Sequence, residues 1–181
     1  MINFTPFPSI RTKNLLLRRM NYNDIQDLFE MRTIPEMIKY VDLKLDETTD
    51  ETRAYINKMN EGIDSNKWII WAIEHESKVI GCISIWNINE AGNSGELGYE
   101  LSLNYQGQGI MKESLLSVIE YGFNVMNLMA LDAYTEEKNV KSINLLKRCN
   151  FIDIDRVHDQ GHINNKIYHM IVFRLENRNY I

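Results

Sequence analysis

Cysteine and histidine are scarce in this sequence, and what there is of them is scattered. The 181 residues include only two cysteines, Cys82 in an apolar stretch and Cys149 near the end of an expected helix. Cysteines so placed are typical of reduced thiols, not of a disulfide framework. None of the four histidines joins a cluster with the spacing of metal ligands. We therefore expect no disulfide and no metal site.

Long hydrophobic runs and basic clusters are also missing. No apolar stretch approaches the roughly 20 residues that cross a bilayer. Residues 1–10 lack the basic and apolar regions of a secretion signal, so we expect a cytoplasmic protein that does not contact a membrane. With 20 basic and 25 acidic residues, the formal net charge is −5. Direct binding to nucleic acid is disfavoured for this reason.

The remaining composition, 44% hydrophobic and 25% charged, is that of an ordinary globular protein. The length suits a single domain over residues 1–181 with its core in residues 10–176, and no repeat or linker divides it.

Hydrophobic periodicity predicts alternating strands and helices. We expect strands at 11–20, 67–74, 78–88, 96–103, 129–134, 151–157 and 166–175, and helices at 24–31, 48–62, 110–127 and 139–148. This order predicts an α/β fold, with a mixed, mostly antiparallel sheet of about seven strands flanked by helices.

The stretch from Glu96 to Met111 is the most informative part of the chain. It begins with the alternation of a strand, breaks at Gly107 and Gly109, and restarts as a helix. Such a turn directs free backbone N–H groups and a positive helix end at one point, which suits a phosphate. The spacing matches neither the dinucleotide nor the nucleoside-triphosphate fingerprint. A tight connection without a ligand is therefore an equally good interpretation of the glycines alone.

Three separated motifs resemble the GNAT superfamily of N-acetyltransferases, and within it the RimJ/RimL-type branch. The first, residues 105–111 after 96–101, resembles the acetyl-CoA signature Gln/Arg-x-x-Gly-x-Gly/Ala, with Met111 departing at its last position. The second, residues 139–151, resembles an Asn-x-x-Ser helix that ends in Gly-Phe, although Asn150 replaces the glycine. The third, residues 10–18, resembles the first strand of that branch.

The resemblance implies that acetyl-CoA is the cosubstrate, and the scattered cysteines and histidines already gave the expectation that no metal takes part. It places the pyrophosphate on the glycine turn and the pantetheine arm beside the preceding strand. The cofactor-binding residues that it implies are Leu101, Ser102, Leu103, Gln106, Gly107, Gln108, Gly109, Ile110, Met111, Lys112, Asn139 and Ser142.

The resemblance also implies two catalytic residues, Glu96 and Ser142. Glu96 would take a proton from the amine, either directly or through water, and Ser142 would protonate the leaving thiolate. Ser142 has this role because Leu146 stands where many GNAT enzymes have a tyrosine. Structural interpretations stay open: Asn139 is a good helix N-cap, and Ser142 is ordinary in a first helical turn. Glu100, on the same strand face as Glu96, is expected simply to face water.

The function implied is acetyl transfer to a primary amine by direct attack in a ternary complex. The acceptor expected from the branch is the α-amine of a protein, gripped by the helices between the first two strands. A small amine such as an antibiotic or polyamine is an alternative acceptor. A CoA-binding module without catalysis is the alternative from another class, and a homodimer is left open.

Overall fold

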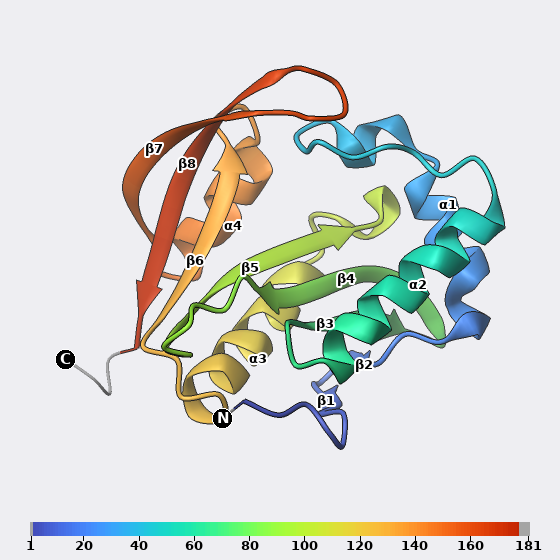
Figure 1. Ribbon diagram of the computed structural model, residues 1–181, viewed down its shortest axis with the longest axis horizontal. Helices are drawn as coiled ribbons and strands as arrows, with labels where there is room; N and C mark the ends of the chain where they lie inside the picture. The colour runs from blue at the N-terminus through green and yellow to red at the C-terminus, as the bar shows by residue number, and fades with distance from the viewer. Residues whose placement is uncertain (1, 178–181) are drawn as a thin grey trace.

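The computed structural model describes residues 2–177 and contains one mixed sheet, ordered β1-β2-β3-β4-β5-β6-β8-β7 (Figure 1). Its strands are β1 (Ile10–Arg11), β2 (Leu16–Arg18), β3 (Ile69–His75), β4 (Lys78–Trp86), β5 (Ser94–Leu101), β6 (Ala130–Glu136), β7 (Ile152–Gln160) and β8 (Ile167–Glu176). Only β5 and β6 pair in parallel among these strands. The helices are α1 (Ile25–Arg32), α2 (Thr49–Asp64), α3 (Ile110–Asn124) and α4 (Val140–Arg148). The predicted fold class is confirmed.

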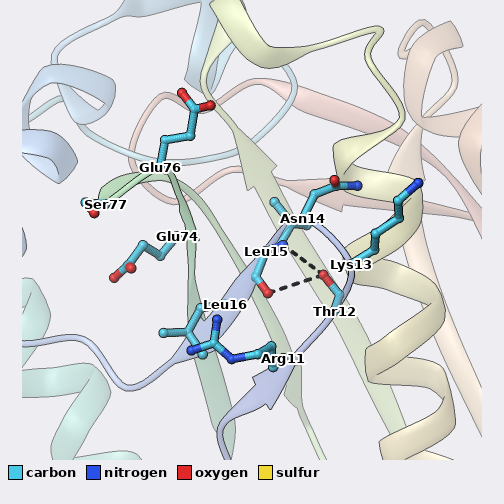
Figure 2. A pocket seen from close by; sticks show the side chains of 9 residues that line it. All are labelled: Arg11, Thr12, Lys13, Asn14, Leu15, Leu16, Glu74, Glu76 and Ser77. Carbon is cyan, nitrogen blue, oxygen red and sulfur yellow. Dashed lines mark hydrogen bonds between the residues drawn. The ribbon is translucent and has the colours of Figure 1, made fainter.

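The sheet has eight strands because the expected first strand is two short ones. A turn joins β1 to β2, in which the Thr12 N–H donates to the Leu15 carbonyl (3.0 Å) and the Leu15 N–H donates to the Thr12 hydroxyl oxygen (2.9 Å). The Glu113 carboxylate of α3 accepts hydrogen bonds from the Thr12 hydroxyl (2.6 Å) and the Asn14 backbone (2.9 Å). Figure 2 shows this turn on the wall of a cavity of about 250 Å³, opposite the β3–β4 turn.

Side chains of β5 point alternately to two covered faces. Gly122 of α3 lies against Ile85 of β4 and Leu131 of β6. Because Ile85 pairs with Leu97 of β5, α3 covers the face of the sheet on which the Leu97 side chain lies. The other face is covered by α1 and α2. The predicted helix start near residue 48 is confirmed: Thr48 is the N-cap of α2, and it forms a capping box with Glu51.

The sheet opens between β5 and β6. The two strands pair only over Ser94–Ala130, Gly95–Leu131 and Glu96–Asp132. Beyond that point β5 stays with β4 as far as Leu101, while β6 stays with β8 as far as Glu136. Figure 1 shows the two arrows fanning apart. We call this divergence the gap.

Two distant segments meet beyond the gap and form what we call the arch, residues 38–45 and 161–168. The Asp42 carboxylate accepts backbone N–H groups of His162 (2.6 Å), Ile163 (3.0 Å) and Asn164 (3.2 Å). The Tyr168 hydroxyl donates to the carbonyl of Val41 (3.0 Å). In Figure 1 the β7–β8 connection reaches across the top of the molecule to this segment.

Candidate active site

The glycine turn before α3 presents a row of free N–H groups. Gly107 and Gly109 have φ of +78° and +84°, a conformation that favours glycine. Gly109 is the N-cap of α3, and the first helical N–H donated is that of Glu113, to the Gly109 carbonyl (3.0 Å). Within residues 2–177, no acceptor takes the N–H groups from Gly107 to Lys112. Six free donors at a positive helix end suit an anion.

The gap exposes the backbone of β5. The Ser102 N–H donates to the Ile80 carbonyl of β4 (2.8 Å). In an antiparallel pair every second residue directs its backbone groups at the partner strand, so those of Glu100 and Gly98 also bond to β4. Tyr99 and Leu101 therefore direct their N–H groups into the gap. The Ser102 N–H donates to β4, and its carbonyl accepts the Tyr105 N–H (2.9 Å), so Ser102 has no free backbone group to offer in the gap.

Gln106 ties the turn to both sides of the gap. Its Nε2 donates to the Leu101 carbonyl (2.9 Å), and its Oε1 accepts from the Lys141 ammonium on α4 (2.9 Å). Lys141 carried no expectation from sequence. Leu103 lies exposed in a short 3₁₀ turn. Ile110 and Met111 are buried, so they can offer a ligand only their backbone, while Gln108 and Lys112 are exposed.

The start of α4 holds Asn139 and Ser142 together. Asn139 is the N-cap, and its Oδ1 accepts the Ser142 N–H (3.2 Å). The Ser142 hydroxyl lies 2.7 Å from the Tyr99 hydroxyl of β5. Burial raises the pKa of Tyr99 to about 12, against a smaller lowering by the Ser142 hydrogen bond. Tyr99 was missed in the sequence, although its alternation with Leu101 places it on the helix face.

Asn139→Ala should lower the free energy of unfolding by about 1 kcal/mol, because the Ser142 N–H loses its cap acceptor. It should also weaken CoA binding if the amide contacts pantetheine. Asn139→Asp separates the two effects, since it keeps the capping oxygen and replaces the amide donor with a carboxylate that cannot donate. Urea unfolding and calorimetry measure both quantities. CoA affinity unchanged in both variants would rule out the pantetheine contact.

Glu96 lies on the opposite face from Ser142, at the last β5–β6 pair before the gap. It lines a cavity of about 220 Å³ with Asn87, Asp132 and Tyr134 among its walls. Burial raises the pKa of Glu96, and the Asp132 carboxylate adds to this, while a hydrogen bond from Asn87 (3.4 Å) opposes it. Asp132 itself is paired with Arg174 (2.7 Å). A half-buried carboxylate with a raised pKa suits a proton acceptor.

Glu100 does not simply face water, as the sequence pattern suggested. It is half-buried beside Cys82 on β4 and near Arg32 of α1, and burial raises its pKa. The Arg32 guanidinium pairs with Asp46 instead (2.7 Å) and stacks on the Tyr55 ring (4.0 Å). The second face of β5 is covered by α1, which the strand alternation alone could not indicate.

Some features of other protein classes are missing from residues 2–177. No group of three or more His, Cys, Asp or Glu could hold a metal ion there. None of the helices in this part combines the length and the apolar character that crossing a membrane requires. Cys82 and Cys149 are both free and buried.

The sheet opens beside a helix start with free N–H groups, with a carboxylate on one face and a hydroxyl on the other. This arrangement suits an acyltransferase that uses an acyl-CoA donor. The family of the acetyltransferase (GNAT) domain matches residues 14–152, and the chain belongs to this family. It is an acyl-CoA N-acyltransferase with acetyl-CoA as its cosubstrate.

Several similar proteins match more than nine-tenths of the chain. The uncharacterized N-acetyltransferase p20 of Bacillus licheniformis is 28% identical over 176 residues, 95% of this chain and 98% of that protein. A putative ribosomal-protein-serine acetyltransferase from Vibrio cholerae has a TM-score of 0.84 at 22% identity, covering 95% and 99% of the chains. A spermidine N-acetyltransferase from Vibrio cholerae, solved with CoA and spermine, has a TM-score of 0.79 at 20% identity, covering 93% and 99%.

Proposed function

We propose that the enzyme transfers acetyl from acetyl-CoA to the α-amine of a protein N-terminus, by direct attack in a ternary complex. The reaction needs a proton acceptor, because an α-amine with a pKa of about 7.7–8.0 is largely protonated at neutral pH. Glu96 takes that proton. The freed lone pair attacks the thioester carbonyl, and the N–H groups of Tyr99 and Leu101 in the gap receive the developing oxyanion.

Collapse of the intermediate breaks the C–S bond and leaves its electron pair on sulfur. Ser142, the proposed acid, supplies the proton to that sulfur from the helix face. The nitrogen of the intermediate gives up its second proton to solvent as the amide forms. The proton that Glu96 took also returns to solvent and Ser142 is reprotonated from solvent, so that one proton is released in each turnover. Acetylated amine and free CoA are the products, and no atom remains on the enzyme.

The charge of the arch is the observation that carries the choice of acceptor. Lys39 and Lys166 lie close together there, with the Lys166 ammonium 3.5 Å from the Lys39 carbonyl. Their ammonium groups rest over the rings of Tyr40 (5.2 Å) and Tyr168 (4.7 Å), and no carboxylate within residues 2–177 pairs with either. The arch has one carboxylate of its own, Asp42, which accepts three backbone N–H groups and pairs with neither lysine.

A cationic arch disfavours a polyamine, because like charges at a binding surface cost affinity. A peptide brings one ammonium to Glu96 and leaves the rest of its chain free to be neutral or acidic. Exposed apolar side chains on the arch, Val41, Leu43, Ile163 and Ile167, also offer contacts that a peptide can use. The fold alone does not choose the acceptor, since similar structures are described with ribosomal-protein and spermidine substrates.

Thiol release from acetyl-CoA with four matched acceptors tests the proposal. The acceptors are a peptide with acidic residues after its free N-terminus, the same peptide with those residues replaced by lysine, the acidic peptide blocked at the α-amine with one internal lysine, and spermidine. We expect the first to have the highest kcat/KM, with mass spectrometry placing the acetyl group on the α-amine.

A paired charge reversal, Lys39→Glu with Lys166→Glu, should remove the preference for the acidic peptide over the lysine peptide. The preference of the unaltered protein should weaken as salt is added, since exposed charges are screened. Spermidine as the best acceptor, or acetylation of the internal lysine in the blocked peptide, would contradict the proposal.

A further inference from the structure

Tyr99 connects the two sides of the gap through its side chain. It comes from β5, whereas its hydrogen-bond partner Ser142 comes from α4, and the two hydroxyl oxygens are 2.7 Å apart. Both residues are half-buried. We infer that Tyr99 is a positioning residue, which holds the Ser142 hydroxyl so that its proton points at the departing sulfur. The inference rests on the proposed role of Ser142 as the acid.

The backbone of Ser142 is held in place, but this does not fix the direction of its hydroxyl proton. The Asn139 cap holds the Ser142 N–H (3.2 Å). A serine hydroxyl can still rotate, and in a helix it often donates back to a carbonyl three or four residues earlier. Here those carbonyls belong to Lys138 and Asn139. A proton directed at either of them is directed away from the gap.

Either hydroxyl of the Tyr99–Ser142 pair can be the donor, and the inference assigns that role to Tyr99. A serine hydroxyl has one donor and two acceptor positions. Partial burial raises the pKa of the Tyr99 phenol to about 12, so the phenol keeps its own proton at the pH of the reaction. When that proton is donated to the Ser142 Oγ, one acceptor position is filled and the Ser142 proton is left for another acceptor.

The same hydrogen bond helps during C–S cleavage. As the sulfur takes the Ser142 proton, negative charge develops on Oγ, and a donor already aimed at that oxygen stabilises the charge. No bond to Tyr99 breaks, and its proton stays on the phenol. The effect of Tyr99 is therefore confined to the chemical step and should not appear in the binding of acetyl-CoA.

Tyr99→Phe tests the inference, because it removes one hydroxyl and keeps the ring. We expect kcat to fall about three- to tenfold on the best acceptor found, with the KM for acetyl-CoA unchanged within twofold. Tyr121→Phe is the matched control. Tyr121 is a half-buried tyrosine on α3 whose ring packs on Trp71 (5.3 Å), and its hydroxyl makes no hydrogen bond within residues 2–177. The kcat of Tyr121→Phe should equal that of the unaltered protein.

The double variant makes the test specific to Ser142. Adding Tyr99→Phe to Ser142→Ala should cause no further fall in kcat, because the hydroxyl to be positioned is gone. In Ser142→Thr, which keeps a hydroxyl, Tyr99→Phe should again lower kcat. Additive losses would overturn the inference and leave Ser142 as an acid that acts without Tyr99. A Ser142→Ala variant with full activity would instead show that the proposed acid is wrong, and the inference falls with it.

Discussion

Gly109→Val should raise the dissociation constant of CoA about a hundredfold while the protein stays folded. The N–H groups from Gly107 to Lys112 can hold a pyrophosphate only if its oxygens approach the backbone closely, and a branched side chain at the N-cap obstructs that approach. Hydrogen bonds to a charged group contribute about 1.5–3 kcal/mol each, so losing one or two accounts for the expected change. Calorimetric titration with CoA measures it.

The control for this prediction must carry the same backbone strain. A side chain at Gly109 meets no atom of the protein within 4 Å, but φ of +84° makes any substitution strained. Gly92, in the β4–β5 loop, has φ of +66° and only Ile2 Cδ1 nearby, at 3.8 Å. Gly92→Val should therefore cost comparable stability and leave the affinity for CoA unchanged. Equal affinities in the two variants would show that the pyrophosphate lies elsewhere.

Local patterns in the sequence were sufficient for most of the elements. The capping box of Thr48 and Glu51 marks the start of α2, and the glycine turn marks the start of α3. The split of the first strand was not predictable in this way, because the run Leu15–Leu17 looks continuous and the turn before it has no glycine or proline. Besides its local Thr12–Leu15 hydrogen bonds, that turn is held by Glu113, 99 residues from Asn14.

The site shows the same division between local and distant contacts. Asn139 as an N-cap follows from its place before a helix. The Tyr99–Ser142 bond joins residues 43 apart, and the Lys141–Gln106 bond joins residues 35 apart. No periodicity reports such pairs, because they depend on where α4 packs against the gap. The surroundings of Glu100 depend likewise on the packing of α1.

Glu96→Gln should lower kcat/KM by about 10²–10⁴-fold at neutral pH, because the amide cannot take the proton of the acceptor ammonium. The loss should shrink as the pH rises toward 9.5, where the amine loses its proton to solvent unaided. The raised pKa of Glu96 adds a second expectation at the acid end. A base works only when it is deprotonated, so the rate of the unaltered enzyme should fall as the pH drops through that raised pKa. The pH–rate profile of Glu96→Gln should lack this fall.

Glu100→Gln is the matched comparison, since it makes the same change on the same strand and the same face, in a carboxyl whose pKa burial also raises. The two residues differ in their surroundings. Glu96 lies at the last β5–β6 pair and lines a cavity, whereas Glu100 packs beside Cys82 and the Arg32–Asp46 ion pair. We therefore expect Glu100→Gln to lower kcat/KM less than tenfold, with a loss that does not change between pH 7 and pH 9.5. If the pH-dependent loss follows Glu100 instead, then Glu100 is the base and Glu96 has a structural role. A loss in Glu96→Gln that is equal at both pH values leads to the same conclusion for Glu96, because only proton transfer to the residue makes its absence matter less when the amine is already neutral.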